Sequence, residues 1–507
     1  MQINDESIQY KRGAIFSYLT LGLNSLTGIF FTPFIIRSLG ENEYGLYQLI
    51  GAYAGYLSIL DMGMSSAVTK YVTKYMHQNR KDKEENFLIW MIFYYTFISI
   101  IVGIIGSVMY HQLGTIFSKS LSPTEIMKAE KMFILLIISL IITLFGGIFR
   151  GVMNAYQRFS ATKGAELVRV IFRIIVIYAV LELGSDSIGL VLMDTLINAI
   201  FFLYRFVYCK SKLHISFHYY GMDRVELKEI FFYSFFVFMN LLFDQLNWKV
   251  DHTILGIKMS TAAISIYSVG MNFSNYFMNF SVAIKSLFLP KVMHMELDGT
   301  NGEKYTSFLI KTGRMQGYIL LYLYFAFLFL GRQFITLIMG ENYDEAWLSA
   351  LLVMTGLIIP LLQNAGHSIL QAQNKHHIYV LVCLGVSIVN AGATWFIVES
   401  KGIVGAAFMT MLSFFLGQAV FLSFYYHKKI GIDMRKFYLE ILRANFFPIT
   451  GVIIIELLIN TFTKTNSWLQ FMIHGGFYSV IYFVSIFFGG MNRDEKNMLF
   501  EKVIKKK

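Results

Sequence analysis

The amino-acid sequence predicts an all-α membrane protein that crosses the bilayer many times. Of its 507 residues, 56% are hydrophobic and only 15% are charged, and the mean hydropathy is +0.55. This balance is unusual for a soluble globular protein. Apolar stretches of about twenty residues recur from end to end, and each is long enough to cross a hydrocarbon core of roughly 30 Å as a helix. Lipid is therefore the expected surrounding of most of the chain.

Hydropathy divides the chain into about fourteen predicted transmembrane helices. The first follows Lys11 and Arg12, as a signal peptide would, but it is too long for a signal peptide and lacks a small-residue cleavage site. We therefore interpret it as a retained helix. The predicted spans are 13–36, 45–69, 87–110, 132–153, 165–181, 188–208, 229–255, 261–290, 316–338, 345–370, 378–398, 402–426, 445–462 and 468–488.

A weak internal repeat predicts that the chain consists of two halves. Leu39-Gly40 recurs as Leu255-Gly256 at an offset of about 216 residues, and other helix pairs show similar matches at nearly the same offset. Six predicted helices separate equivalent positions, so the halves have the same orientation in the membrane and should enclose a central cavity. The expected parts are a first six-helix bundle (1–210), a cytoplasmic linker (211–228), a second six-helix bundle (229–428) and two appended helices with a basic tail (429–507).

The basic residues gather in alternate loops. The net charge is +11, and the basic loops include 70–83, 205–228, 428–443 and the tail Lys505–Lys507, whereas the intervening connections, such as 183–187, are nearly neutral or acidic. Cytoplasmic loops of membrane proteins carry the excess of Lys and Arg, so both termini are predicted to be cytoplasmic. The charge thus indicates topology and attraction to anionic lipid, and no nucleic-acid partner is expected.

The motifs of soluble catalysis are missing from the sequence. No Gly-Lys dipeptide occurs, so there is no loop of the kind that cradles ATP phosphates. The longest outer loop, 111–131, is too short for a catalytic domain. The histidine pairs and the two cysteines lack the spacing and supporting ligands of a metal site. They are His214, His218, His376, His377, Cys209 and Cys383. We therefore expect no enzyme activity, no cofactor and no metal.

Polar side chains in the seventh span are the best candidates for a transport pathway, because charge in hydrocarbon is costly unless protein or water surrounds it. Asn240, Asp244, Asn247 and Asp251 are spaced by four, three and four residues, which places them on one helical face. This stripe is predicted to line a wet cavity. Lys249 falls on the opposite side of a continuous helix, so it is predicted to anchor the helix at the membrane interface.

Three further intramembrane residues are candidate sites. Asn24 precedes Gly40 by the same interval that separates Asn240 from Gly256, which makes it a second cavity candidate, although it could simply join helices by a hydrogen bond. Asp61 and Asp194 could bind a coupling cation, or each could be paired with a buried base.

Basic side chains near the cytoplasmic ends of the spans are candidates for contact with an anionic substrate. Arg150 and Lys285 have this position, and Arg173, about two turns inside the fifth span, is a third candidate. The alternative for each is that it extends toward the interface or pairs with a carboxylate, as Arg169 is expected to pair with Glu166.

Three segments resemble the polysaccharide transporters of the multidrug/oligosaccharidyl-lipid/polysaccharide superfamily, and in particular the O-antigen and capsule flippases of the Wzx type. They are Arg37-Ser-Leu-Gly-Glu-Asn-Glu-Tyr-Gly-Leu-Tyr47, Leu60-Asp-Met-Gly-Met-Ser-Ser66 and Arg150-Gly-Val-Met-Asn-Ala-Tyr-Gln-Arg-Phe159. The resemblance implies two six-helix bundles around a cavity. It also implies transfer of a polyprenyl-diphosphate-linked oligosaccharide from the inner to the outer leaflet by alternating access, coupled to a gradient of protons or sodium.

That family usually binds the diphosphate with basic residues inside the cavity, but here the first span has no basic residue between Arg12 and Arg37. The resemblance therefore directs this role to Arg150, Arg173 and Lys285. The implied location is the bacterial inner membrane, and the implied partners are the lipid-linked cargo, membrane lipids and other membrane proteins of polysaccharide assembly.

Two other functions have to be compared with the flippase. A cation-coupled multidrug exporter would use an acidic cavity, which the carboxylates of the seventh span could supply. An O-antigen polymerase or lipid-linked glycosyltransferase would need a sizeable outer loop or a soluble domain, and the sequence has neither.

The predicted topology can be tested with reporter fusions. Fusions at Ser187 and Thr465 are expected to behave as external and a fusion at Asn79 as internal, because the basic loops alternate along the chain. The measurement is the activity of a reporter that works on only one side of the membrane. The reverse pattern would refute cytoplasmic termini.

Overall fold

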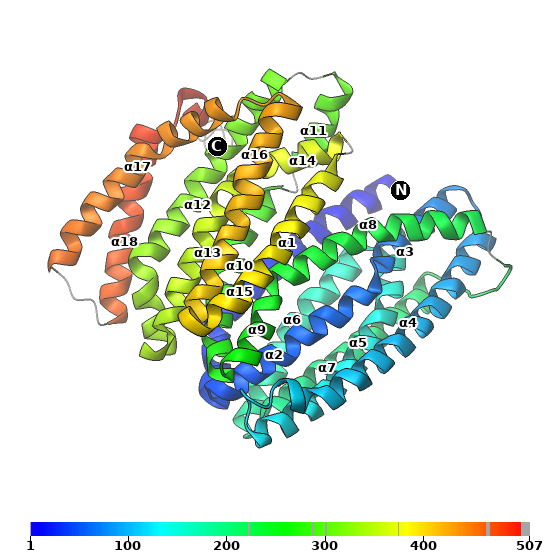
Figure 1. The fold of residues 1–507 in the computed structure, drawn as a ribbon. Helices are drawn as coiled ribbons and strands as arrows, with labels where there is room; N and C mark the ends of the chain where they lie inside the picture. Colours follow the sequence, from blue (N-terminus) through cyan, green and yellow to red (C-terminus); the bar gives the residue numbers. More distant parts are fainter. Residues whose placement is uncertain are drawn as a thin grey trace. The chain divides into compact units, whose positions relative to one another are not determined.

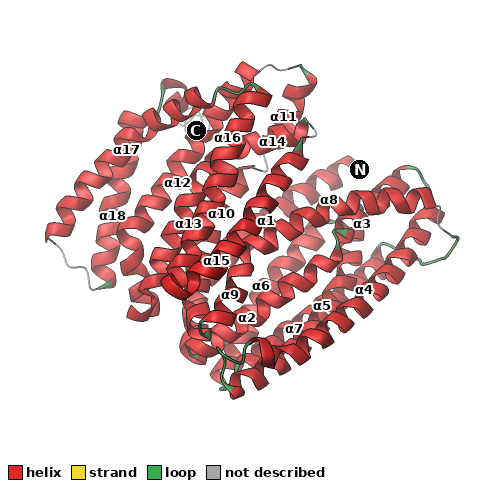
Figure 2. Cartoon of the chain, in the orientation of Figure 1, coloured by secondary structure: helices red, strands yellow, loops and turns green. Residues whose placement is uncertain are grey.

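The computed structural model of the protein describes residues 2–221, 224–285, 288–299, 302–373, 375–462 and 467–497. Within these ranges nearly every residue is helical and no strand occurs (Figures 1 and 2). The predicted all-α fold is therefore confirmed. The predicted outer connection at Thr465 and the basic tail that ends at Lys507 lie outside the described residues.

The chain divides into two units, Met1–Ser268 and Val269–Lys507. The helices of the first unit are α1 (Gln2–Leu39), α2 (Glu41–Ser58), α3 (Met64–His77), α4 (Lys81–Ile116), α5 (Pro123–Ala155), α6 (Phe159–Glu182), α7 (Ser187–Lys212), α8 (Arg224–Trp248) and α9 (Val250–Lys258). Helix α10 (Thr261–Lys285) begins in the first unit and continues into the second. The division into two six-helix repeats with an intervening linker stays a prediction.

The second unit continues with α11 (Phe288–Leu297), α12 (Gly302–Met339), α13 (Asp344–Leu362), α14 (Asn364–Ala372), α15 (His376–Ser413), α16 (Leu422–Tyr425), α17 (Met434–Phe462) and α18 (Trp468–Ser485). Short 3₁₀ turns cover Ile59–Asp61 and Glu341–Tyr343, and π-helical turns cover Phe414–Phe421, Tyr426–Ile430 and Ile486–Gly490.

Ten helical segments of the described chain are long and apolar enough to cross a membrane, and each predicted span falls on one or two of the helices. The segment His377–Ile430 has 54 residues, which at 1.5 Å per residue exceeds twice the thickness of a hydrocarbon core. It kinks at Gly402, where φ is 59°, at the predicted boundary between two spans. The number fourteen stays a prediction.

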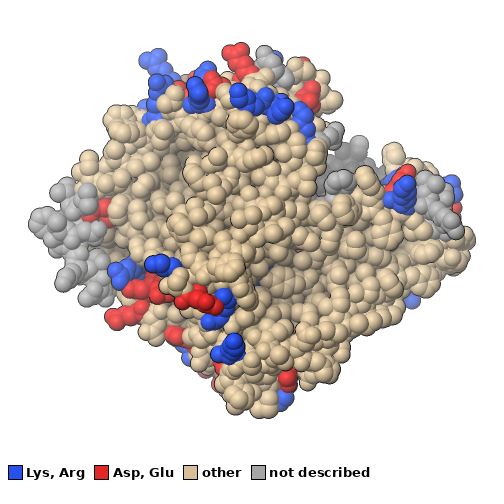
Figure 3. Space-filling view, viewed as in Figure 1, with Lys and Arg blue, Asp and Glu red and all other residues tan. Residues whose placement is uncertain are grey.

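The surface of the helices agrees with a lipid environment. On the face shown in Figure 3, Lys, Arg, Asp and Glu gather in small groups near helix ends, and uncharged residues cover the sides of the helices. Large apolar side chains such as Phe97, Phe396 and Phe488 are more than half exposed. Such a surface would be unfavourable in water, and the protein is a multi-pass membrane protein.

Several predicted spans are interrupted helices. Between α2 and α3 the chain turns through Met62 and Gly63, both with positive φ (49° and 71°). A Cβ on Gly63 would lie 2.4 Å from the Val237 side chain, so both the backbone conformation and the packing require glycine. The predicted seventh span is likewise divided at Lys249, which separates α8 from α9.

Small residues of α5 allow α3 to pack closely against it in the first unit. Ser65 Oγ donates to the Gly147 carbonyl (3.5 Å) and Thr69 Oγ1 to the Gly151 carbonyl (3.2 Å). Helix α5 also packs against α2, α4 and α7. In a membrane no hydrophobic effect drives helices together, and small residues at the interface allow the two backbones to approach closely.

The junction of α9 and α10 is docked on α2 and on the turn that precedes α5. A Cβ on Gly45 of α2 would lie 1.7 Å from the Thr261 carbonyl oxygen. The Thr261 hydroxyl donates to Glu125 Oε1 (2.7 Å), and the Ser120 hydroxyl donates to the Gly256 carbonyl. The backbone of α2 at Gly45 is therefore in direct contact with the backbone of α10 at Thr261.

We expect Gly45→Ala to destabilise the protein by about 1–3 kcal/mol, because the added methyl group would force the α2 and α10 backbones apart. The measurement is the thermal unfolding of the detergent-solubilised protein. Gly103→Ala is the matched control, since a Cβ there meets nothing within 4 Å. Equal stability of the two variants would contradict the close backbone contact.

Candidate functional site

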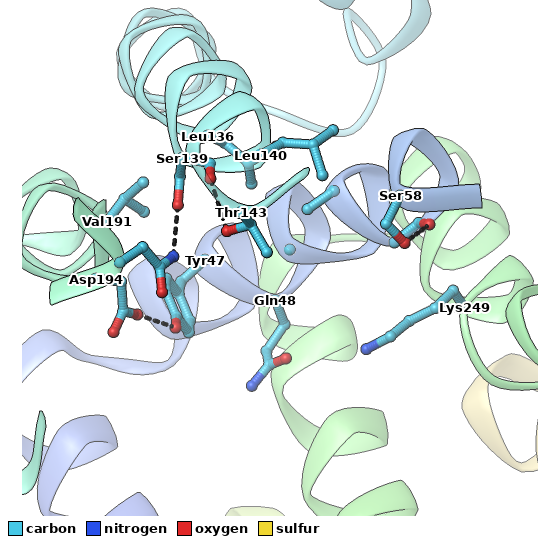
Figure 4. A pocket seen from close by; sticks show the side chains of 14 residues that line it. Tyr47, Gln48, Ser58, Leu136, Ser139, Leu140, Thr143, Val191, Asp194 and Lys249 are labelled. Atoms are coloured by element: carbon cyan, nitrogen blue, oxygen red, sulfur yellow. Dashed lines mark hydrogen bonds between the residues drawn. The ribbon is translucent and has the colours of Figure 1, made fainter. Parts of the chain in front are cut away.

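A polar cavity of about 390 Å³ lies in the first unit. Helices α2, α5 and α7 and the break between α8 and α9 line it (Figure 4). Its polar lining residues are Tyr47, Gln48, Ser58, Ser139, Thr143, Asp194, Asn198 and Lys249. Small residues of α2 also line it: a Cβ on Gly51 would meet nothing within 4 Å, and a Cβ on Gly55 would lie 2.4 Å from the Gln245 side chain of α8.

An ion pair with a tyrosine lies at one side of this cavity. Arg173 Nε is 2.6 Å from Asp194 Oδ1, and Arg173 Nη2 is 2.9 Å from Asp194 Oδ2. The Tyr47 hydroxyl donates to Asp194 Oδ2 (2.9 Å; Figure 4) and accepts from Arg173 Nη2 (3.1 Å). This two-point geometry fixes the planar guanidinium and the carboxylate relative to each other.

A second chain of hydrogen bonds continues along the same helices. Arg169 Nη2 donates to Asn198 Oδ1 (2.6 Å), and Asn198 Nδ2 donates to Ser139 Oγ (2.8 Å). The amide orientation of Asn198 follows from its partners, since the guanidinium can only donate. The polar groups contributed by α5, α6 and α7 are therefore held in place before any ligand binds.

Lys249 differs from these residues because it has no ion-pair or hydrogen-bond partner for its ammonium group among the described residues. Its backbone N–H donates to the Gln245 carbonyl (2.9 Å) at the helix break. Its side chain extends into the cavity, as does that of Gln48 (Figure 4). The cavity therefore contains a cation that no described carboxylate neutralises.

Lys249 was predicted to anchor the helix at the membrane interface, opposite the stripe, but the structure places it in the lining of the first-unit cavity. The prediction assumed one continuous helix, in which nine residues of about 100° each place Lys249 opposite Asn240. The described cavity is lined by Lys249 and not by Asn247 or Asp251 of the stripe, so the error concerned which face of the helix borders a cavity.

Asp194 and Arg173, which the sequence analysis assigned to different roles, are brought together. Of the two alternatives for Asp194, the geometry matches pairing with a buried base. The predicted coupling role of Asp194 and the predicted substrate contact of Arg173 are not tested by this arrangement and stay predictions.

The structure also gives Asp61 and Arg150 partners. Asp61 lies in the turn before α3 and accepts a hydrogen bond from the Tyr95 hydroxyl (2.6 Å). Arg150 of α5 is exposed, donates to Ser65 Oγ (3.2 Å) and interacts electrostatically with Asp61. Asp61 thus supports the start of α3, and its role in coupling stays a prediction.

The stripe predicted in the seventh span lies across the α8–α9 break. Asn247 is buried and donates to the Phe243 carbonyl (3.2 Å), and Asp251 is buried and accepts from the Tyr267 hydroxyl (2.5 Å). Neither is among the residues that line the described cavity. The side chains of Asn240 and Asp244 lie outside the described residues, so their exposure to water stays a prediction.

The remaining candidates are scattered. Asn24 is exposed on α1, and the side chain of Lys285 lies outside the described residues. The expected pair of Glu166 with Arg169 is not formed: Glu166 pairs with Lys163 (2.8 Å), three residues earlier on the same helix, whereas Arg169 bonds to Asn198. Among the described residues, no group of three or more His, Cys, Asp or Glu side chains could hold a metal ion.

The sequence analysis missed Tyr47, Gln48 and Ser139 and gave Lys249 the wrong place. A signal for the α2 face was present, because Gln48, Gly51, Gly55 and Ser58 follow one another at spacings of three and four residues. Such a stripe of small and polar residues in an apolar span indicates a face that does not contact lipid. No comparable signal marks the break at Lys249.

The fold is that of known membrane transporters. The structure of the lipid II flippase MurJ in an inward closed conformation has a TM-score of 0.70 at 15% sequence identity and covers 98% of this chain and 99% of its own. An inward-facing multidrug resistance MATE family transporter of the MOP superfamily has a TM-score of 0.64 at 12% identity, with 82% of this chain and 94% of that chain covered. A mutant of the Vibrio cholerae MATE transporter VcmN has a TM-score of 0.56 at 13% identity, with 87% and 98% covered.

The sequence assigns the protein to one family of membrane proteins. The model of the family described as polysaccharide biosynthesis protein matches residues 10–293, more than half of the chain, and the protein belongs to that family. No curated protein sequence is similar enough to the chain to count as a match. The resemblance seen in the three sequence segments is thereby confirmed at the level of the superfamily.

We expect Asp194→Asn to lower the stability of the protein by about 1–3 kcal/mol, because the half-buried Arg173 loses its charged hydrogen-bond partner. The double variant Arg173→Gln with Asp194→Asn should recover part of this loss, since no unpaired charge remains. The measurement is thermal unfolding of the purified protein.

The control is Asp344→Asn, which breaks the exposed Arg332–Asp344 pair and should leave the melting temperature nearly unchanged. If the single and double variants at Asp194 are equally stable, the ion pair does not organise the cavity.

Proposed function

We propose that this protein is a flippase that moves a polyprenyl-diphosphate-linked oligosaccharide, such as an O-antigen, capsule or exopolysaccharide repeat unit, from the inner to the outer leaflet by alternating access. The observation that carries the proposal is the ammonium group of Lys249, which has no partner among the described residues, in a polar cavity of the membrane-spanning helices. Membership of the polysaccharide biosynthesis family supports the choice of cargo.

The chemistry of the cavity suits an anionic, hydroxyl-rich ligand. A diphosphate cannot cross hydrocarbon unaided, because removing its charge from water is very costly. Lys249 offers a charge-assisted hydrogen bond to a phosphate oxygen. The Gln48 amide offers a neutral donor and acceptor for sugar hydroxyl groups, and the Ser58 and Thr143 hydroxyls, which donate to backbone carbonyls, offer acceptors. Arg173 is paired with Asp194, so among the described residues that line this cavity Lys249 supplies the excess positive charge.

Loading of the cargo takes place from the cytoplasmic leaflet in this proposal. Arg150 is exposed near the end of α5, and with Lys285 it captures the anionic headgroup there. The lipid tail stays in the bilayer while the sugars pass through the protein. The protein resides in the bacterial inner membrane with both termini cytoplasmic.

Transport draws on a gradient of protons or sodium, with Asp61 and Asp194 as the candidate coupling residues. Asp194 would have to leave its pair with Arg173 in order to bind a cation. Membrane lipids and other membrane proteins of polysaccharide assembly are the expected partners.

A cation-coupled multidrug exporter is the alternative, because MATE transporters share the fold. The charge of the cavity distinguishes the two functions. A cationic drug requires an uncompensated carboxylate, whereas among the described residues that line this cavity the group without a partner is an ammonium and Asp194 is already paired. This difference favours the flippase.

A strain without this protein is expected to accumulate its lipid-linked repeat unit on the inner leaflet. Lys249→Gln should reduce transfer by about tenfold or more, because a hydrogen bond to a charged group is worth about 1.5–3 kcal/mol, while Lys249→Arg should retain most activity. The measurement is the leaflet distribution of the lipid-linked oligosaccharide. Arg150→Ala with Lys285→Ala should impair loading without loss of the folded protein.

The matched control is Lys401→Gln, which removes an exposed lysine of α15 and should transport normally. The flippase proposal fails if the deletion leaves surface polysaccharide unchanged and instead sensitises the cells to cationic dyes. That result would establish the exporter.

A further inference from the structure

A second buried ionisable site lies in the second unit, between α17 and α18. Glu456 and His474 are 1% and 6% exposed. His474 Nε2 is 2.8 Å from Glu456 Oε2. His474 is the seventh residue of α18, which places it about 10 Å along the helix from its first residue. Ionisable groups inside membrane-spanning helices are costly and therefore indicate function.

Each member of this pair has one polar atom left without a partner. Glu456 Oε1 and His474 Nδ1 are both inaccessible to solvent and form no hydrogen bond with the described residues. A purely structural contact would be expected to satisfy both groups or to use apolar side chains of similar volume. The imidazole therefore retains an unused nitrogen beside a carboxylate.

The surroundings of the pair offer little competing charge. Tyr478 of α18 interacts electrostatically with Glu456, with Tyr482 of its own helix and with Tyr322 of α12. Tyr478 donates to the Tyr322 carbonyl (2.7 Å), and the Tyr322 hydroxyl bonds to Ser479 (2.8 Å). Farther along α12, Arg332 is exposed and paired with Asp344. No described Lys or Arg lies within ion-pair distance of Glu456.

We propose that Glu456 and His474 form a proton-binding site of the two C-terminal helices. When Nε2–H donates to Glu456, the lone pair of Nδ1 is free and the site carries one buried negative charge. A proton delivered by hydronium binds at Nδ1 and leaves a water molecule behind. The site then holds an imidazolium and a carboxylate with no net charge.

Proton binding at this site changes the packing of α17 and α18. A net buried charge is unfavourable in a low-dielectric surrounding, whereas a neutral ion pair with a short hydrogen bond is tolerated. Uptake of the proton therefore favours the docked arrangement of the two helices. The inference goes beyond the proposed function, because it requires neither a particular cargo nor activity of the cavity.

The test is the ¹⁵N resonance of His474 in the full-length protein in lipid nanodiscs. The histidines are isotope-labelled, and His474→Gln identifies the signal. Between about pH 8 and pH 5, the His474 signal is expected to shift from a neutral imidazole to an imidazolium. In Glu456→Gln it should stay neutral over the whole range, because the counter-charge is gone.

The matched control is Glu440→Gln, which removes a carboxylate near the start of the same helix α17 and should leave the His474 signal unchanged. Constant protonation of His474 in the unaltered protein over this range would overturn the proposal, and this result does not depend on any variant folding. An identical shift in the unaltered protein and in Glu456→Gln would also overturn it, since Glu456 would then play no part.

Discussion

The lack of water in the bilayer core is the constraint on which the structure depends. A polar group there has to find its partner within the protein, and for this reason helices, which satisfy their own backbone, make up nearly all of the described chain. The same constraint governs side chains. Arg173 with Asp194, and Arg169 with Asn198, show intramembrane arginines that are neutralised or hydrogen-bonded by an adjacent helix. Against this background, a lysine without a partner among the described residues is informative.

Breaks in the helices place the functional candidates. The turn between α2 and α3 positions Asp61, and the break between α8 and α9 positions Lys249. A continuous helix shows side chains at fixed angular intervals, so a polar residue on its lipid side cannot reach a cavity. At an interruption the side chains no longer follow these fixed angles. The backbone N–H and C=O groups that lose their helical partners there need hydrogen bonds from neighbouring groups. Asp61 and Lys249 both lie at such interruptions.

Much of the fold could be predicted from the sequence, because hydropathy depends only on composition over about twenty residues. The kink at Gly402 falls at the predicted boundary between two spans, and the family was recognisable from short segments near Gly40, Asp61 and Arg150. The candidate site could be predicted less well from the sequence. The pairing of Arg173 with Asp194 joins two helices through side chains that no local pattern relates. Lys249 was misplaced because periodicity gives the angles between side chains on a helix but not which face borders a cavity. The α8–α9 break also has no local signal, since proline is absent there and Trp248 and Val250 are compatible with a helix.

The joint between α8 and α9 links the backbone to the electrostatic potential of a cavity. Lys249 is the one residue between these two helices, and its ammonium group lies in the polar space beside Gln48. A change in the φ and ψ angles of this residue would therefore move a charge within the cavity and alter the potential there without any proton or ion being exchanged.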